Sequence, residues 1–285
     1  MELDDPLVYL NGDFTPLSQA RVSVLDRGFI FGDGVYDVVP LYDRRMFRPT
    51  QHMARLSRSL RETGIPDPYE PSTWLGLVER VSSAHSASDQ LVYIQVTRGV
   101  APRNHSFPVN MTPTVFIMAN PLVPPSREMR EKGVACVSIE DQRWLRCDSK
   151  ATSLLGNVLA AQQAATHGVT EVVQFRDGWL TEGSSTNIWM VSNGVLIAPP
   201  CDNLILEGIR YGLLAELCGT IGIAFQPRRI SRKDVFAADE MLMSSASKEV
   251  LAITKLDGQR IGNGAPGPIY HALHEAYQKA KRAPS

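Results

Sequence analysis

The chain has 285 residues, of which 44% are hydrophobic, and its formal net charge is −1 at pH 7. A chain of this length can bury one large core or two smaller ones. Because basic and acidic residues are nearly balanced and scattered, the composition argues against a nucleic-acid or polybasic membrane surface. It favours a small molecule as the substrate.

The cysteines and the N-terminus indicate a reducing, aqueous location. The four cysteines are widely separated and form no CxxC or CxxxH spacing, which argues against a zinc site or a disulfide framework. The first ten residues, MELDDPLVYL, are acidic and do not resemble a signal peptide. No stretch approaches 18 consecutive apolar residues, as a membrane span would require. We therefore expect a cytoplasmic protein.

Two-residue turn signals recur between apolar segments along the chain. Both Asn-Gly and Asp-Gly accept the positive φ angles of type I′ turns, which match the twist of paired strands. They occur at Asn11-Gly12, Asp177-Gly178, Asn193-Gly194 and Asp257-Gly258. Four such hairpins predict mostly antiparallel sheet.

Helical periodicity appears between these turns. The stretch PTQHMARLSRSLRETG predicts a helix with Thr50 as its N-cap and Gly64 as its stop, and with Met53, Leu56 and Leu60 as its apolar residues. A second helix should end at Gly168. Its apolar residues share one face and are Leu154, Leu155, Val158, Leu159 and Ala165. A third helix, LEGIRYGLLAELCGTIG, should point Leu213, Leu214 and Leu217 inward.

A change of composition at residues 119–133, ANPLVPPSREMREKG, predicts a domain boundary. Three prolines followed by a charged run are typical of an exposed connector. We expect a small domain at 1–120, a connector at 121–133 and a larger domain at 134–285 that carries Lys150. Both parts mix hairpins with helices, so the predicted class is α+β.

The chain shows none of the common metal or nucleotide motifs. HExxH, GxSxG and GxxxxGK[ST] are absent, and the six histidines do not cluster at ligand spacing. The GDG at residues 32–34 is too short for a dinucleotide fingerprint, and a turn explains it. We therefore predict no metal.

Lys150 is the first candidate for chemistry. It follows the aromatic and apolar stretch RWLRC and precedes a run of small residues. Burial there would favour a neutral amine that can form an imine. On this segment alone, a snorkelling lysine at a helix start is the more common occurrence.

Three further segments carry candidate polar sites. In WLTEGSSTNIWMV, Glu182 precedes hydroxyl residues that could cradle an anion, although a polar loop with an acidic N-cap is the alternative. In VTRGVAPRNHSFP, Arg98, Arg103 and His105 could bind a carboxylate or form an exposed basic loop. Arg55 could bind phosphate, or it could belong to a solvated stripe with neighbouring arginines of its helix.

Taken together, the chain resembles the fold-type IV pyridoxal-phosphate enzymes, which include D-amino acid transaminases, branched-chain aminotransferases and aminodeoxychorismate lyases. Seven segments match in order along nearly the whole chain: DRGFIFGDGVYDVV, HMARL, VTRGVAPRNHSFP, RWLRCDSK, LLGNVLAAQ, TEGSSTN and MSSASKEV. They resemble the D-amino acid transaminase branch most closely. The resemblance implies a two-domain fold with mostly antiparallel sheets.

The resemblance also implies roles for these residues. Lys150 would hold pyridoxal 5'-phosphate (PLP) covalently and move a proton at the substrate α-carbon. Glu182 would keep the pyridine nitrogen protonated, and Arg55 would pair with the phosphate. The full implied cofactor set, in which Ile209, Arg210 and Ala246 act through backbone N–H groups, is Arg55, Lys150, Glu182, Ser184, Ser185, Thr186, Leu206, Ile209, Arg210, Ser245 and Ala246.

Substrate selection would rest on Tyr36, Arg103 and His105, which trap the α-carboxylate in the enzymes that this chain resembles. In that family the arginine–histidine loop comes from the partner subunit, so a homodimer is implied. The side on which the carboxylate binds decides which α-hydrogen faces Lys150, and this sets the preference for D-amino acids.

The implied reaction is ping-pong transfer of an amino group from a D-amino acid to a 2-oxo acid such as pyruvate or 2-oxoglutarate. Branched-chain enzymes lack the PRNHSFP pattern and rank second, beside (R)-amine transaminases. Aminodeoxychorismate lyases rank below both, and a catalytically idle PLP carrier is the rival of another class. The chain departs from the family at Arg210 and Ala246, where threonine is frequent. Each change removes a hydroxyl from the expected phosphate site.

Overall fold

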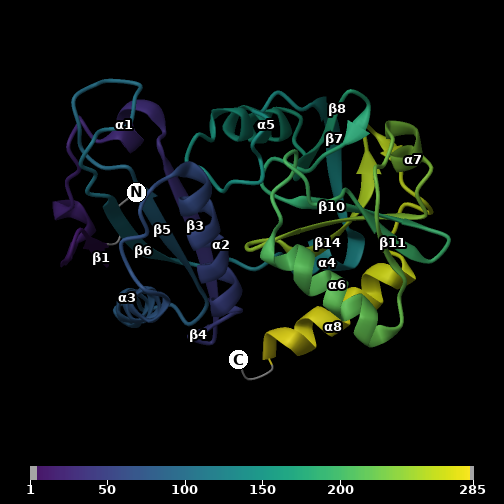
Figure 1. Cartoon of the computed structure of the whole chain (residues 1–285). Helices are drawn as coiled ribbons and strands as arrows, with labels where there is room; N and C mark the ends of the chain where they lie inside the picture. The colour runs from purple at the N-terminus through teal and green to yellow at the C-terminus, as the bar shows by residue number, and fades with distance from the viewer. Residues whose placement is uncertain (1–4, 283–285) are drawn as a thin grey trace. The chain divides into compact units, whose positions relative to one another are not determined.

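The computed structural model describes residues 5–282 (Figure 1). Its internal contacts divide the chain into two units, and the chain passes from the first to the second between Val123 and Pro124. The segment Ser149–Leu154 returns to the first, N-terminal unit, and residues 155–282 belong to the second, C-terminal unit.

The N-terminal unit contains a six-stranded sheet in the order β2-β1-β6-β5-β3-β4, in which every neighbouring pair is antiparallel. The strands are β1 (Leu7–Leu10), β2 (Asp13–Pro16), β3 (Gly34–Tyr42), β4 (Arg45–Met46), β5 (Gln90–Thr97) and β6 (Thr114–Pro121). The helices are the 3-10 turn η1 (Leu17–Gln19), α1 (Arg27–Phe31), α2 (Pro49–Thr63) and α3 (Pro71–Ser83).

Helices α2 and α3 pack against this sheet and supply much of its core (Figure 1). Leu56 of α2 and Trp74 of α3 are buried, as the periodicity of α2 predicted for Leu56. Helix α2 ends at Gly64 with a left-handed φ of 66°, which confirms the predicted stop. The predicted N-cap at Thr50 was wrong, because the helix begins at Pro49, whose missing N–H and preset φ suit the first helical position.

The segment Ser149–Leu154 joins the N-terminal unit because its backbone bonds to the start of β3. Tyr36 N–H donates to the Lys150 carbonyl, and Thr152 N–H donates to the Gly34 carbonyl, both at 2.9 Å. The sequence-based division had placed this segment with residues 134–285. The difference arises because these hydrogen bonds are long-range in sequence and leave no local pattern.

The C-terminal unit contains a nine-stranded sheet in the order β12-β11-β10-β13-β14-β7-β8-β9, with β15 added beside β14. Its strands are β7 (Val134–Glu140), β8 (Glu171–Arg176), β9 (Trp179–Leu180), β10 (Asn187–Ser192), β11 (Val195–Ala198), β12 (Phe225–Pro227), β13 (Glu240–Ser245), β14 (Glu249–Leu256) and β15 (Gln259–Arg260). Its helices are α4 (Arg127–Lys132), α5 (Leu155–Thr166), α6 (Ile209–Ile221), α7 (Arg232–Phe236) and α8 (Pro268–Arg282).

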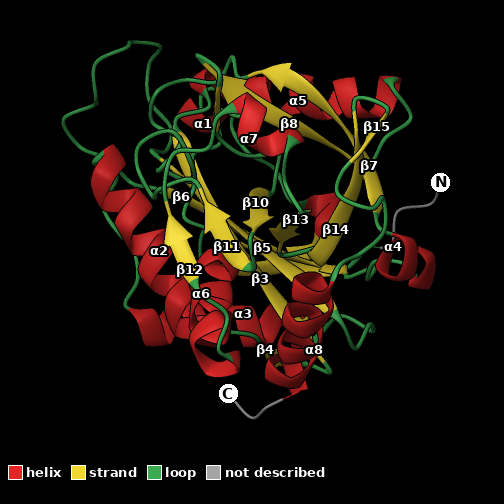
Figure 2. Cartoon of the chain, turned by 90° about the vertical axis from the view of Figure 1, so that its right-hand side faces the viewer, coloured by secondary structure: helices red, strands yellow, loops and turns green. Residues whose placement is uncertain are grey.

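Most strand pairs in this second sheet are also antiparallel, which confirms the predicted α+β class. The parallel pairs are β11 with β12, β14 with β7, and β7 with β8. Helix α5 makes the crossover between β7 and β8, as a parallel connection requires. Helices α6 and α8 lie side by side in two views (Figures 1 and 2).

All four predicted two-residue hairpins are present. Both central residues of each turn have positive φ, for example 51° and 107° at Asn11 and Gly12, and 50° and 75° at Asn193 and Gly194. The flanking residues pair directly across each turn, as Leu10 does with Asp13. The type I′ chemistry of Asn-Gly and Asp-Gly therefore predicted these connections from local sequence alone.

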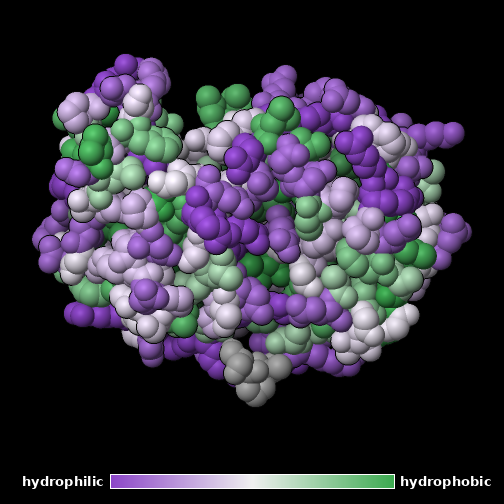
Figure 3. Space-filling view, viewed as in Figure 1, coloured by the Kyte–Doolittle hydropathy of each residue, from purple (hydrophilic) through white to green (hydrophobic). Residues whose placement is uncertain are grey.

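Helix α5 buries two alanines and exposes its large apolar residues. Ala160 and Ala164 pack toward the sheet, whereas Leu155, Val158 and Leu159 are 71%, 59% and 56% exposed. Hydrophobic side chains accordingly reach the surface over α5 (Figure 3). The helix ends at Thr166, two residues before the predicted Gly168. Within residues 5–282, no helix is long and apolar enough to cross a membrane.

Candidate active site

Lys150 lies in an extended segment beside β3 and does not begin a helix. Its side chain is half-buried, and its Nζ lies 4.1 Å from the centroid of the Tyr36 ring. Its backbone N–H donates to the Ser59 hydroxyl of α2 at 3.2 Å. Because α5 starts only at Leu155, the alternative of a snorkelling charge at a helix start is excluded. Backbone hydrogen bonds to β3 and α2 fix the segment that carries Lys150, and its amine lies against the Tyr36 ring.

Arg55 is a buried cation with a fixed partner. Its Nε and Nη2 each donate to the Asp37 carboxylate at 2.9 Å, and His52 Nδ1 lies 2.7 Å from the same carboxylate. Although burial opposes the shift, Arg55 and His52 hold the pKa of Asp37 well below its usual range. A solvated arginine stripe is therefore excluded for Arg55. The N–H groups of the Arg55 guanidinium that do not bond to Asp37 can donate to an anion.

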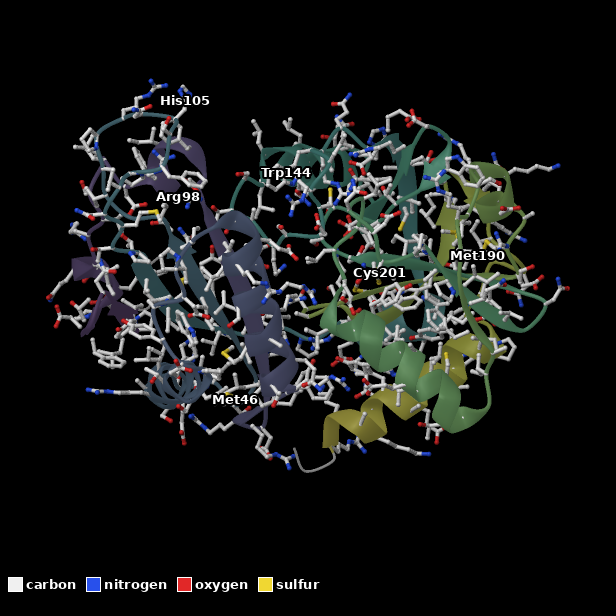
Figure 4. The ribbon with its side chains drawn as sticks, viewed as in Figure 1. Met46, Arg98, His105, Trp144, Met190 and Cys201 are labelled. Atoms are coloured by element: carbon white, nitrogen blue, oxygen red, sulfur yellow. The ribbon has the colours of Figure 1, made fainter. Side chains whose placement is uncertain are left out.

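The arginines of the loop after β5 fall into two classes. Arg98 is 3% exposed and makes a bidentate ion pair with Asp33 at 2.8 and 2.9 Å, so its role is internal. Arg103 and His105 are exposed and sit beside the Phe31 ring, at 5.5 Å and 5.3 Å from its centroid. Figure 4 shows His105 at the outer tip of the loop and Arg98 beneath it. Only Arg103 and His105 can meet a carboxylate from solution.

In the C-terminal unit, Glu182 is buried and bound on both sides. It pairs with Arg143, and its Oε2 accepts the Leu206 N–H at 2.9 Å. Arg143 also makes two bonds to Asp141, at 2.8 and 2.9 Å, which fix the guanidinium. Burial raises the pKa of Glu182 against the opposing effect of Arg143. A carboxylate must be ionised to hold a proton on a nitrogen heterocycle, and the contacts with Arg143 and the Leu206 N–H favour the ionised form of Glu182.

A second buried carboxylate, Glu171, orders the hydroxyl residues that follow Glu182. It accepts the backbone N–H and the hydroxyl of Ser184, at 3.0 and 2.5 Å, and the hydroxyl of Thr186 at 3.2 Å. Lys248 pairs with it at 2.8 Å and, against the effect of burial, lowers the pKa of Glu171. The Ser184 and Thr186 side chains therefore bond within the protein, and the loop geometry is fixed.

The N-terminus of α6 offers backbone donors typical of an anion site. Gly208 caps the helix without a side-chain hydrogen bond, so the first N–H groups, including those of Ile209 and Arg210, are the ones an anion would meet. A Cβ at position 208 would lie 2.2 Å from the Asn187 amide oxygen, so a larger residue would have to displace that side chain. The Arg210 side chain is 2% exposed and contacts the Tyr277 hydroxyl of α8 at 3.4 Å. The side chain is therefore turned away from solvent, and the backbone N–H of Arg210 is placed for an anion at the start of the helix.

The remaining predicted residues lie at the same end of the unit's strands and loops. Ser245 ends β13, and its hydroxyl accepts the Lys248 N–H at 3.0 Å across the turn that contains Ala246. The carbonyl of Leu206 accepts from Asn187 at 2.8 Å. Ser185 is exposed. The N-terminal unit thus carries Tyr36, Arg55, Arg103, His105 and Lys150, and the C-terminal unit carries the other predicted residues.

Sequence reasoning missed the partners that orient these groups. Arg143 lies 39 residues from Glu182 and Glu171 lies 13 from Ser184, so no local spacing connects them. Asp37 could have been noticed as a charged residue in an otherwise apolar strand. Among the residues that the structure describes, no three His, Cys, Asp or Glu side chains gather as metal ligands would.

Comparison with known proteins finds relatives across nearly the whole chain. Residues 34–256 match the amino-transferase class IV family. A D-alanine aminotransferase of Staphylococcus epidermidis is 37% identical over 273 residues, which cover 95% of this chain and 96% of that protein. A D-alanine aminotransferase of Bacillus licheniformis is 35% identical over 273 residues, 96% of each.

Solved structures share the fold. A branched-chain aminotransferase of the archaeon Thermoproteus uzoniensis, determined with norvaline, superposes with a TM-score of 0.87 at 27% identity, over 96% of this chain and 94% of that one. A hypothetical aminotransferase of Mycobacterium tuberculosis, in its PLP-bound form, superposes with a TM-score of 0.83 at 21% identity, over 97% of this chain and 99% of that one. At the latter identity the likeness concerns the fold alone.

Proposed function

Since the chain belongs to the class IV aminotransferases, we propose that it is a PLP-dependent aminotransferase that moves the amino group of a D-amino acid to a 2-oxo acid. The observation that carries the choice of D-amino acids is the loop with Arg103 and His105, exposed on the unit that holds Lys150 and Tyr36. The near full-length similarity to D-alanine aminotransferases supports the same choice.

The residues of both units fit PLP. Its phosphate needs a cluster of N–H donors and a cation, which the start of α6 and the buried Arg55 supply. Its pyridine nitrogen needs a buried acidic partner, which Glu182 supplies. Its aldehyde needs a held amine, which Lys150 supplies. We propose that these residues bind PLP, which, when bound, accepts the amino group and withdraws the electron pair released at the substrate α-carbon.

The protein's own residues then divide the work. Lys150 would move the proton at the substrate α-carbon, because its amine lies against the Tyr36 ring and its backbone is hydrogen-bonded to β3 and α2. Glu182, oriented by Arg143, keeps a proton on the pyridine nitrogen. Arg103, His105 and Tyr36 bind the α-carboxylate and so decide which α-hydrogen faces Lys150.

The active form is proposed to be a homodimer. The apolar side chains that α5 leaves exposed would be covered by a second copy, and exposed Trp144 and Leu145 extend the apolar area of the same unit, at 47% and 61%. Exposed clusters of this kind mark interaction sites. Leu159→Asp should then give a monomer in sedimentation, whereas Ala161→Asp, exposed on the same helix, should leave the dimer intact. A Leu159→Asp variant that stays dimeric would contradict the proposal.

We place the protein in the cytoplasm. The four cysteines, which all lie within residues 5–282, form no disulfide in the structure, and three of them are buried. Thiols persist in a reducing compartment. Fractionation of the native host, with the protein in the soluble cell fraction, would support this placement.

One experiment separates the proposed reaction from its rivals. Borohydride should fix the cofactor to the Lys150 peptide, and D-alanine should yield more than one pyruvate per enzyme only when an acceptor such as 2-oxoglutarate is present. Repeated turnover that releases pyruvate from a substrate without any acceptor would indicate a lyase. Faster turnover of L-leucine would indicate a branched-chain enzyme, and turnover of (R)-1-phenylethylamine that survives Arg103→Ala would indicate an amine transaminase. Each of these results would overturn the proposal.

A further inference from the structure

Arg27, Asp33 and Arg98 form one ion cluster next to the loop that carries Arg103 and His105. Asp33 lies in the turn between α1 and β3, and its carboxylate accepts from Arg27 at 2.7 Å and from Arg98 at 2.8 and 2.9 Å. Both arginines are 3% exposed. Burial opposes the shift, but Arg98 and Arg27 lower the pKa of Asp33, so the cluster keeps two cations around one carboxylate.

Arg27 reaches from this cluster to the backbone of the loop that carries Arg103 and His105. Its Nη2 donates to the His105 carbonyl at 3.3 Å, and its Nη1 donates to the carbonyls of Asn104 and Ser106, the latter at 3.4 Å. Three consecutive carbonyls therefore share one planar guanidinium. The Arg27 backbone N–H also donates to the Gly99 carbonyl at the loop base, at 2.9 Å.

Arg98 ties the other end of the same loop to α2. Its Nη2 donates to the Thr63 carbonyl at 2.8 Å and its Nη1 to the Gly64 carbonyl at 2.9 Å, while its guanidinium carbon lies 3.5 Å from the centroid of the Phe107 ring. The loop has no regular secondary structure of its own. Its shape therefore depends on contacts made from below by Arg27 and Arg98.

We propose that Arg27, Asp33 and Arg98 are positioning residues that hold the Arg103–His105 loop for the α-carboxylate. Because the Arg27 guanidinium donates to carbonyl groups of the loop, the side chains of Arg103 and His105 stay exposed for the substrate while the backbone is fixed. Ordering the loop in advance removes an entropic cost from substrate binding. The inference rests on the proposed function, in which this loop binds the carboxylate.

The test compares Arg27→Met with Arg27→Lys in the holoenzyme. Methionine removes the ion pair and all three carbonyl contacts, and the KM for D-alanine should rise by about tenfold or more, the loss expected for one to two charge-assisted hydrogen bonds. The kcat should change by less than about threefold, since no group at the reacting atoms is altered. Lysine keeps the charge beside Asp33 but lacks the planar guanidinium. The KM of Arg27→Lys should therefore lie between those of the parent and of Arg27→Met.

A second readout does not depend on activity. Amide hydrogen exchange of residues 103–107 should speed up in Arg27→Met and less in Arg27→Lys. Arg44→Met is the matched control, because Arg44 makes the same kind of contact, at 3.2 and 3.0 Å, to the carbonyls of His85 and Ser86 in another loop. It should change neither the KM nor the exchange of residues 103–107.

A double variant shows whether Arg27 acts through the loop. In a background of Arg103→Ala with His105→Ala, Arg27→Met should raise the KM by less than about threefold, because the groups that it positions are gone. If both Arg27 variants are active and either the KM for D-alanine or the amide hydrogen exchange of residues 103–107 is unchanged, the positioning role of Arg27 is rejected. A parent enzyme without D-alanine turnover would reject the proposed function itself, and with it any catalytic role for Arg27.

Discussion

Glu182 and Arg103 are held in opposite ways. Glu182 is 6% exposed, and its carboxylate is fixed directly by Arg143 and the Leu206 N–H. Arg103 is exposed, and the loop that carries it is held by its carbonyls, through Arg27. The first arrangement sets the basicity and direction of one group. The second arrangement fixes the backbone of a loop and keeps the side chains of that loop exposed to solvent.

The difference corresponds to the two tasks proposed for these residues. A partner of a cofactor that never leaves gains from burial, because a low dielectric strengthens its interaction. A group that must meet a new substrate in every cycle has to remain reachable. Fixing its backbone retains part of the benefit of preorganisation without covering it.

The largest effect should come from Glu182→Gln. The amide keeps the shape but cannot hold a proton on the pyridine nitrogen, so kcat should fall by about 10²–10³-fold, the scale of losing one preorganised electrostatic partner. The KM for D-alanine should stay nearly constant. Steady-state kinetics decide this, and a variant that mainly raises KM would place Glu182 in substrate binding.

Arg103→Ala should change the KM more than the kcat, which is the reverse of the effect expected for Glu182→Gln. Removing an exposed carboxylate partner should raise the KM for D-alanine by roughly 10–100-fold, with a smaller change in kcat. The free energy of unfolding should change by no more than about 0.5 kcal/mol, since the side chain is exposed. A loss of stability of several kcal/mol would show that Arg103 has a structural role.

Arg143→Met should alter the pH dependence. Burial raises the pKa of Glu182 and Arg143 opposes this, so removing the arginine raises that pKa further. The acid limb of the kcat profile should therefore move to higher pH, with kcat at neutral pH lower by about tenfold. Since the folded state then holds the proton more firmly than the unfolded chain, the stability of the variant should decrease as pH rises through the folded pKa of Glu182.

The control for this prediction is Arg176→Met. Arg176 pairs with Asp141 at 3.1 Å and donates to the Arg143 carbonyl at 2.7 Å, but it makes no ion pair with Glu182. Its removal should leave the acid limb within about 0.3 pH units of the parent, an energy difference below 0.5 kcal/mol. An equal shift in both variants would mean that Glu182 responds to the overall charge and not to Arg143.

The parts of the fold that follow local rules were predictable from sequence. The Asn-Gly and Asp-Gly turns and the Gly64 helix stop depend on the φ angles of one or two residues, and these predictions are confirmed. The predicted start of α2 was wrong, because Pro49 takes the first helical position and the N-cap is Arg48 instead of Thr50.

The orientation of the candidate site was not predictable. Lys150 is held by β3 and α2, and Glu182 by Arg143, through contacts that join distant parts of the sequence. The apolar face of α5 was also recognisable as a pattern. Periodicity says that such a face must be covered, but it does not say whether the chain's own core or a second copy covers it.

The most direct test of the account is the single-turnover reaction of the holoenzyme with D-alanine and L-alanine in the absence of an acceptor. Loss of the cofactor absorbance reports the first half of the transfer. We predict that D-alanine reacts at least about 100-fold faster than L-alanine, a difference of about 2.7 kcal/mol in activation free energy. An enzyme that reacts with L-alanine as fast as with D-alanine, or faster, would contradict the assignment of Arg103 and His105 as the residues that select the D-isomer.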